Sequence, residues 1–259
     1  MTRSPLVVVH RDKQLLADAA AARLVTAIVD AQASRGEADI VLTGGSMGSA
    51  ILASLGSSPA RDAIDWGCVN IWWGDERYLP AGDPERNDTQ AMEALLAHVP
   101  LDPARVHPMP AADGPEGDRV EDAARRYAGE LAAAAKLGED VPRFDVVMLG
   151  VGPDAHVASL FPEHPALHDE EASVVAVHGS PKPPPTRISL TFRALCTGRD
   201  VWFLVSGEDK ARAVGLALSG AGVRQAPAAG VSGRRSTTWL LDRPAAAHVP
   251  RALVRISSP

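Results

Sequence analysis

Cysteine, positive charge and long hydrophobic runs are all scarce in this chain. Its two cysteines, Cys68 and Cys196, are not in a metal-binding spacing, so we expect neither a disulfide framework nor a metal site. The formal net charge of −6 argues against nucleic acid as the main partner, because binding to a phosphate backbone needs a basic surface. No segment approaches the roughly 18 apolar residues of a membrane span, and the apolar run near the N-terminus is too short for a signal peptide. We therefore expect a cytoplasmic protein that binds neither membranes nor nucleic acid.

What the chain does contain is a regular alternation of apolar, β-branched runs with longer helical segments. This alternation predicts an α/β fold with a parallel sheet covered by helices, and residues 1–259 suffice for one domain with a small subdomain. Strands are expected at 6–9, 40–43, 69–74, 144–149, 173–177, 188–190, 201–206 and 238–241. Helices are expected over 116–137, over 208–218 and after the first strand, where an apolar stripe is formed by Leu16, Ala20, Leu24, Ile28 and Ala31 and ended by Gly36. Loops rich in Pro, Gly and Asp are expected at 80–85, 111–117 and 179–185.

The segment 144–149 is almost entirely apolar and lacks alternation, which is typical of a strand buried on both faces of a parallel sheet. Ligands bind beyond the carboxyl ends of such strands, and here a Gly-Pro turn leads to Asp154 and His156. An imidazole with a pKa near ~6.5 can take a proton from water at neutral pH, so His156 is a candidate general base. Asp154 either orients the imidazole or shapes the turn.

The turn Thr43-Gly44-Gly45-Ser46 joins a predicted strand to a predicted helix. Glycines let backbone N–H groups approach an anion, and the helix N-terminus adds a positive dipole, which favours a phosphate-binding turn. The alternative is an ordinary glycine turn with Ser46 as the helix N-cap. The spacing fits neither a Walker A loop nor a dinucleotide fingerprint, and we expect no cofactor. The same residues also fit the G-x-S-x-G pattern of serine hydrolases, but no HGGG-type oxyanion segment accompanies it.

Cations lie near the ends of three other predicted strands. Arg77, in the segment GDER, can bind a carboxylate or phosphate or stabilise an oxyanion, although an ion pair among Asp75, Glu76, Arg77 and Arg86 is the simpler interpretation. Arg187 and Lys210 are each ordinary solvated charges when taken alone. Together with the glycine turn they could neutralise a phosphate dianion. The proline-rich run at 181–185 is either a semi-rigid rim of this site or a stiff connector.

Five motifs occur in order across nearly the whole chain: TGGS, GDERYLP followed by ERND, LGVGPDAHVASLFP, PPPTRISLT and SGEDKARAV. Together they resemble the 6-phosphogluconolactonase family. The resemblance implies hydrolysis of 6-phospho-D-glucono-1,5-lactone in the oxidative pentose phosphate pathway. We expect the protein to be a monomer whose partner is its sugar-phosphate substrate. It also implies a glucosamine-6-phosphate deaminase-like fold, with a Rossmann-like sheet and a smaller attached subdomain. The implied base is His156, the polarising cation is Arg77, and the phosphate-binding residues are Gly44, Gly45, Ser46, Arg187 and Lys210, with Thr43 in the same turn.

One position departs from the family pattern, because Ala155 stands where the family has glycine. An alanine with positive φ would be strained by about 1 kcal/mol, and we expect φ to be negative here.

Two other functions are considered. A glucosamine-6-phosphate deaminase is expected to have an asparagine–glutamate pair where this chain has SLFP (159–162). A non-catalytic sugar-phosphate sensor has no need of Arg77 and His156 at strand ends.

Overall fold

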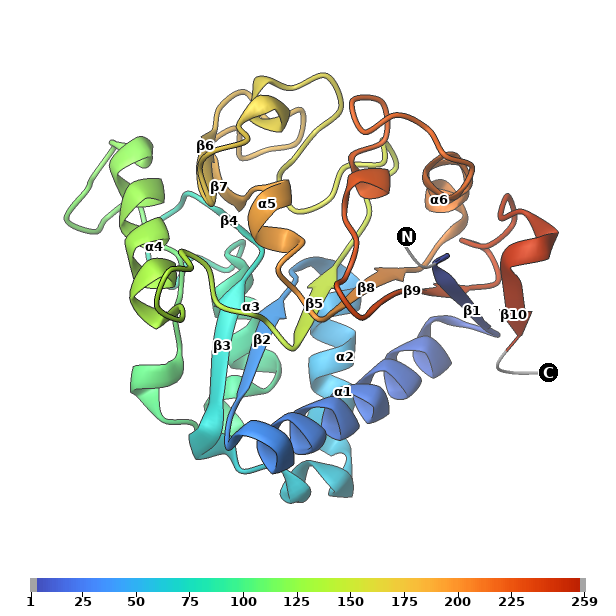
Figure 1. The fold of residues 1–259 in the computed structure, drawn as a ribbon, viewed down its shortest axis with the longest axis horizontal. Coiled ribbons are helices and arrows are strands. Elements are labelled where there is room, and N and C mark those ends of the chain that lie inside the picture. Colours follow the sequence, from blue (N-terminus) through green and yellow to red (C-terminus); the bar gives the residue numbers. More distant parts are fainter. Residues whose placement is uncertain (1–3, 257–259) are drawn as a thin grey trace.

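The computed structural model describes residues 4–256, which form a large parallel sheet and a small antiparallel sheet. The large sheet has the strand order β10-β1-β9-β8-β5-β2-β3, and the small one has the order β4-β7-β6 (Figure 1). The strands of the large sheet are β1 (Leu6–His10), β2 (Ala38–Leu42), β3 (Val69–Trp73), β5 (Val146–Leu149), β8 (Asp200–Val205), β9 (Ser236–Asp242) and β10 (Val254–Ile256). Those of the small sheet are β4 (Asp75–Arg77), β6 (Val174–Val177) and β7 (Arg187–Leu190). This arrangement confirms the predicted Rossmann-like α/β class, while the division into a domain and a subdomain stays a prediction.

The helices connect and cover these strands. They are α1 (Lys13–Arg35), α2 (Gly45–Ser57), α3 (Asn87–Ala94), α4 (Val120–Ala134), α5 (Phe192–Leu195) and α6 (Ala211–Leu218). Short 3-10 turns lie at Pro59–Ala63, Trp66–Cys68, Leu96–His98, Pro103–Arg105, Pro165–His168, Glu208–Lys210, Pro227–Gly230 and Arg251–Leu253. Helices α1 and α2 pack on each other, whereas α4 lies beside the small sheet (Figure 1). In the described part of the chain, no helix is both long enough and apolar enough to cross a membrane.

The predicted strands and the first helix are confirmed, with ends that differ by one or two residues. Every residue of the predicted stripe on α1 is buried, and Gly36 ends the helix with a φ of +83°. The helix expected over 116–137 is shorter, because Gly117 has a φ of +58° before it and the extended Ala135 caps its end. The 208–218 segment begins with a 3-10 turn before α6. Strands β4 and β10 were not predicted, since three residues are too few to form a pattern.

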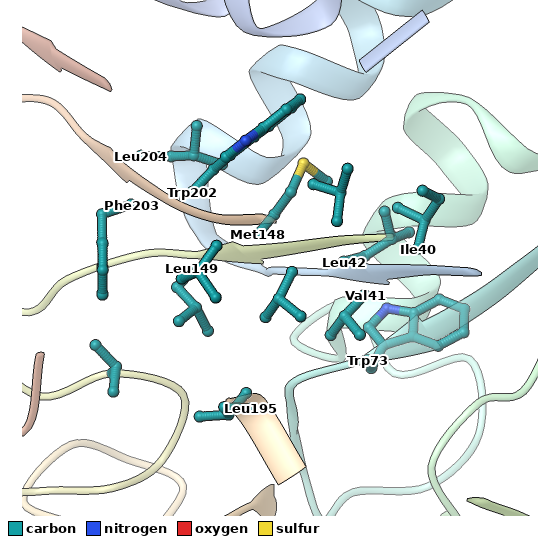
Figure 2. Close-up of a cluster of buried hydrophobic side chains, with 14 of the residues drawn as sticks. Ile40, Val41, Leu42, Trp73, Met148, Leu149, Leu195, Trp202, Phe203 and Leu204 are labelled. Carbon is teal, nitrogen blue, oxygen red and sulfur yellow. The ribbon is translucent and has the colours of Figure 1, made fainter. Parts of the chain in front are cut away.

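The core is centred on β5, whose four residues are buried on both faces of the sheet as the missing alternation predicts. Figure 2 shows Met148 and Trp202 on one face of the sheet and Leu149, opposite Leu195 of α5, on the other. Trp72 and Trp73 of β3 are fully buried as well, so they are core residues and not a ligand platform. The buried core of the large sheet therefore extends to the carboxyl ends of β2 and β5.

Those two strand ends form the switch point of the sheet. From β2 the chain passes through α2 to β3 on one side, whereas from β5 it proceeds to β8 on the other side. Connections that leave neighbouring strands in opposite directions open a crevice between them. At this point the backbone N–H of Gly150 donates to the Thr43 hydroxyl at 3.1 Å, which ties the two strand ends together.

Candidate functional site

A cleft lies at this switch point, and residues from motifs that are far apart in the sequence line it. Nearly all of the predicted site residues line it, namely Thr43, Gly44, Gly45, Ser46, Arg77, His156, Arg187 and Lys210. Asp154 is not part of the lining, but it contacts the cleft through His156. The cleft is also lined by Asp75, Asn87 and Lys182, which were not predicted as site residues.

The floor of the cleft is the glycine turn that precedes α2. Gly45 has a φ of +77°, and Gly44 is the N-cap of the helix, so the alternative with Ser46 as N-cap is wrong. No side chain caps α2, whose N-terminal N–H groups and positive dipole end face the cleft. A Cβ on Gly44 would lie 1.8 Å from the Asn87 Oδ1 atom, so this position must be glycine for Asn87 to approach. The turn thus has the features of an anion-binding site.

The imidazole of His156 is held by Asp154, with 2.5 Å between Nδ1 and Oδ1. Burial alone would raise the pKa of Asp154, but the hydrogen bond and charge of His156 lower it to about 2, so the carboxylate is ionised at neutral pH. An ionised carboxylate accepts the Nδ1 proton, which leaves Nε2 as the nitrogen that can take a proton from a substrate or water. Of the two roles considered for Asp154, orientation of the ring is the one this contact supports.

The turn that carries this pair is tight, and it requires particular residues. A Cβ on Gly152 would lie 2.1 Å from the His156 ring, so the imidazole occupies the space of a missing side chain. Ala155 has a φ of +68°, and the expectation of a negative φ is wrong. The reason is the closure of the turn, in which Ala155 donates to Gly152 O at 2.9 Å and Gly152 donates to His156 O at 3.0 Å. A left-handed alanine costs about 1 kcal/mol.

Two arginines are register partners on neighbouring strands of the small sheet. In the register of β4 and β7, Arg77 is directly opposite Arg187, and both line the cleft. The Arg77 Nη1 atom donates to the Glu85 carbonyl at 2.5 Å, while its buried Nε has no hydrogen-bond partner within residues 4–256. Two guanidinium groups on neighbouring strands repel each other unless an anion lies between them. The pair therefore favours a negatively charged ligand.

The acidic neighbours of Arg77 are structural. Glu76 is buried and accepts backbone hydrogen bonds from Arg77, Asn87 and Asp88. Burial and the charge of Asp88 raise the pKa of Glu76, against the opposing effects of these donors and of Arg86, whose Nη2 lies 4.0 Å from Oε2. Arg86 is also buried and binds Asp88 at 2.8 Å. The expected ion pair thus forms between Glu76 and Arg86, which leaves Arg77 to the cleft.

Positive charge exceeds negative charge in the cleft. Its cations are Arg77, Lys182, Arg187 and Lys210, whereas Asp75 is the only carboxylate among the described residues that line it. The Asp75 carboxylate accepts from Ser159 at 2.7 Å and lies 4.0 Å from Arg187. This concentration of cations, in a chain with a net charge of −6, indicates a site for an anionic ligand.

Two of the unpredicted residues, Lys182 and Asn87, differ in how far the sequence indicates them. Lys182 lies in the proline-rich run, so a lysine within a stiff segment next to Arg187 was a usable hint. Asn87 begins α3, and its Nδ2 donates to the Asp75 carbonyl at 2.8 Å. The position of Asn87 in the cleft depends on the packing of α3 against β4, which no local pattern shows.

Comparisons with known proteins agree with this geometry. The 6-phosphogluconolactonase of Streptomyces coelicolor is 64% identical over 255 residues, which cover 98% of this chain and 98% of that protein. That of Mycobacterium tuberculosis is 50% identical over 247 residues, covering 95% and 99%. The solved structure of the Trypanosoma brucei 6-phosphogluconolactonase superimposes with a TM-score of 0.80 at 28% identity and covers 95% of this chain and 99% of that one. The family model of glucosamine-6-phosphate isomerases/6-phosphogluconolactonase matches residues 11–239, and this chain belongs to that family.

Proposed function

We propose that this chain is a lactonase that hydrolyses 6-phospho-D-glucono-1,5-lactone to 6-phospho-D-gluconate, the second step of the oxidative pentose phosphate pathway. The names of its relatives support this substrate, since the similarity to the Streptomyces coelicolor protein extends over nearly the full length of both chains. The observation that carries the proposal is the cleft itself. It combines an imidazole–carboxylate pair with an anion-binding turn and an excess of cations.

In the proposed mechanism the phosphate end of the substrate binds at the glycine turn and the nearby cations. Binding energy from this remote group orients the lactone at the reacting end of the cleft. Nε2 of His156 removes a proton from a water molecule as the water oxygen attacks C1, while Asp154 keeps the Nδ1 proton in place. General-base assistance of this kind contributes about 10²- to 10⁴-fold to the rate.

Arg77 stabilises the negative charge that develops on the carbonyl oxygen of the lactone. One such donor is worth about 3 kcal/mol in other enzymes that stabilise an oxyanion. The protonated His156 then gives its proton to the ring oxygen as the C1–O bond breaks. The position of Arg77 in the lining of the same cleft as His156 is consistent with this role.

The direct test is a coupled assay with freshly generated lactone, corrected for its spontaneous hydrolysis. We expect 6-phosphogluconate to form at a rate proportional to enzyme concentration. Release of ammonia from glucosamine 6-phosphate would instead identify a deaminase, and binding of the lactone without turnover would identify a sensor. Covalent labelling of Ser46 by a fluorophosphonate would identify a serine hydrolase. The cytoplasmic location and the monomeric state stay predictions, and sedimentation velocity tests the second.

A further inference from the structure

The loop over 179–185 brings one lysine, Lys182, into the wall of the cleft. Its neighbours on that wall are Arg187 and Lys210, the two cations that the motifs predict. Lys182 itself has no assigned role. Its side chain is partly buried, unlike that of a lysine on an open surface.

The backbone of Lys182 is fixed from two directions. The Lys182 carbonyl accepts from Arg187 Nη2 at 3.1 Å and from the Ser180 hydroxyl at 2.9 Å. Arg187 also donates to the carbonyls of Pro183 and Pro184, each at 3.2 Å. The prolines have restricted φ angles as well. A ligand that binds the lysine therefore has to order only the side chain, which lowers the entropic cost of binding.

Arg187 consequently has less freedom to bind a ligand than its motif suggests. Its Nε and Nη2 atoms are occupied by the loop carbonyls, and its Nη1 lies 4.0 Å from Asp75 Oδ2. The guanidinium is buried, with the residue 5% exposed. Arg187 thus acts in large part as the residue that holds the Lys182 loop.

The charge of Lys182 is only partly balanced by the protein. Within the described residues it forms no ion pair, and the nearby carboxylate of Asp154 is already bound to His156. Burial and the like charges of Lys210 and Arg187 lower the pKa of Lys182, against the opposite charges of Asp154 and Asp209. A partly desolvated cation among other cations is unfavourable, and an anionic ligand relieves that cost.

We propose that Lys182 binds the phosphate of the substrate, that Arg187 positions it, and that Lys182 thereby selects phosphorylated over unphosphorylated lactones. This inference rests on the proposed function and adds a specificity-determining residue to it. The recognised chemistry is a phosphate monoester dianion, which lysine binds through charge-assisted hydrogen bonds.

The test compares Lys182→Met, which removes the charge, with Lys182→Arg, which keeps it. The control is Lys13→Met, since Lys13 is an exposed lysine at the start of α1 and is not part of the cleft. For the phosphorylated lactone, Lys182→Met should raise KM by about 10- to 100-fold with little change in kcat, the effect expected for one hydrogen bond between charged groups. Its kcat/KM for D-glucono-1,5-lactone should stay unchanged. Lys182→Arg should recover most of the loss, and Lys13→Met should match the wild type.

If the wild-type chain is an active lactonase, either of two results overturns the inference about Lys182. In one, Lys182→Met leaves the KM for the phosphorylated lactone unchanged. In the other, it lowers the activity on both lactones equally. If the wild-type chain turns over no lactone, the proposed function fails, and calorimetric titration with inorganic phosphate tests Lys182 separately. Binding that is weakened at least about tenfold in Lys182→Met supports the site, and equal binding by both proteins overturns it.

Discussion

Replacement of Ala155 by glycine should leave the stability of this protein nearly unchanged, although a buried methyl group is removed. Ala155 is fully buried, and its φ is +68°. Loss of the methyl costs about 0.8 kcal/mol, and the extra freedom of glycine in the unfolded chain costs about 0.4–1 kcal/mol. Glycine also relieves the strain of the left-handed backbone at position 155, which stabilises the folded state by about 1–2 kcal/mol. We therefore expect the free energy of unfolding to stay within about 1 kcal/mol of the wild type.

The matched control is Ala226→Gly. Ala226 is equally buried but has a φ of −136°, so glycine relieves no strain there. Its replacement should destabilise the protein by about 1.5 kcal/mol, from the methyl and entropy contributions alone. Urea unfolding of the three proteins, followed by tryptophan fluorescence, measures the difference. Equal destabilisation by the two substitutions would refute the assignment of strain to Ala155.

Three further predictions concern the proposed catalytic pair, His156 and Asp154, and its turn. His156→Ala should lower kcat by about 10²- to 10⁴-fold with a much smaller change in KM, and an unchanged kcat in steady-state assays removes the residue from the mechanism. The pKa of Asp154 is lowered from 3.8 to about 2, so its carboxylate stabilises the fold above pH 3.8 and loses this effect as the pH falls toward 2. Chemical unfolding across that range should therefore show a smaller loss of stability in Asp154→Asn than in the wild type, and parallel curves would contradict the pairing. Gly152→Ala should displace the His156 ring and reduce kcat at least about tenfold, because the new Cβ would lie 2.1 Å from it. Retained activity would show that the ring can move without loss.

The parts of the fold that were predictable from sequence are those specified by local patterns. Residue type and spacing alone predict three such features. They are the buried strand β5, from its uninterrupted apolar run, the buried face of α1, from its apolar stripe, and the turn before α2, from its glycines. The convergence of Arg77 and His156 on one cleft was also expected, because each follows a strand of a parallel sheet.

The remaining features depend on contacts between distant segments. The positive φ of Ala155 follows from the closure of its turn and not from the residue type. The use of Arg187 as a support for the 179–185 loop depends on three carbonyls that no spacing identifies. Asn87 reaches the cleft because α3 packs against β4 and because Gly44 has no side chain in its way.

The opposed arginines of the small sheet have a consequence for how the molecule responds to its ligand. Arg77 and Arg187 belong to β4 and β7, whereas the glycine turn and His156 extend from strands of the large sheet. An anion that binds these arginines together with the glycine turn or His156 contacts both sheets, so its binding should stabilise the contact between the two sheets. Saturation at 100 times Kd should then add about 2.7 kcal/mol to the free energy of unfolding and slow the hydrogen exchange of β4 and β7.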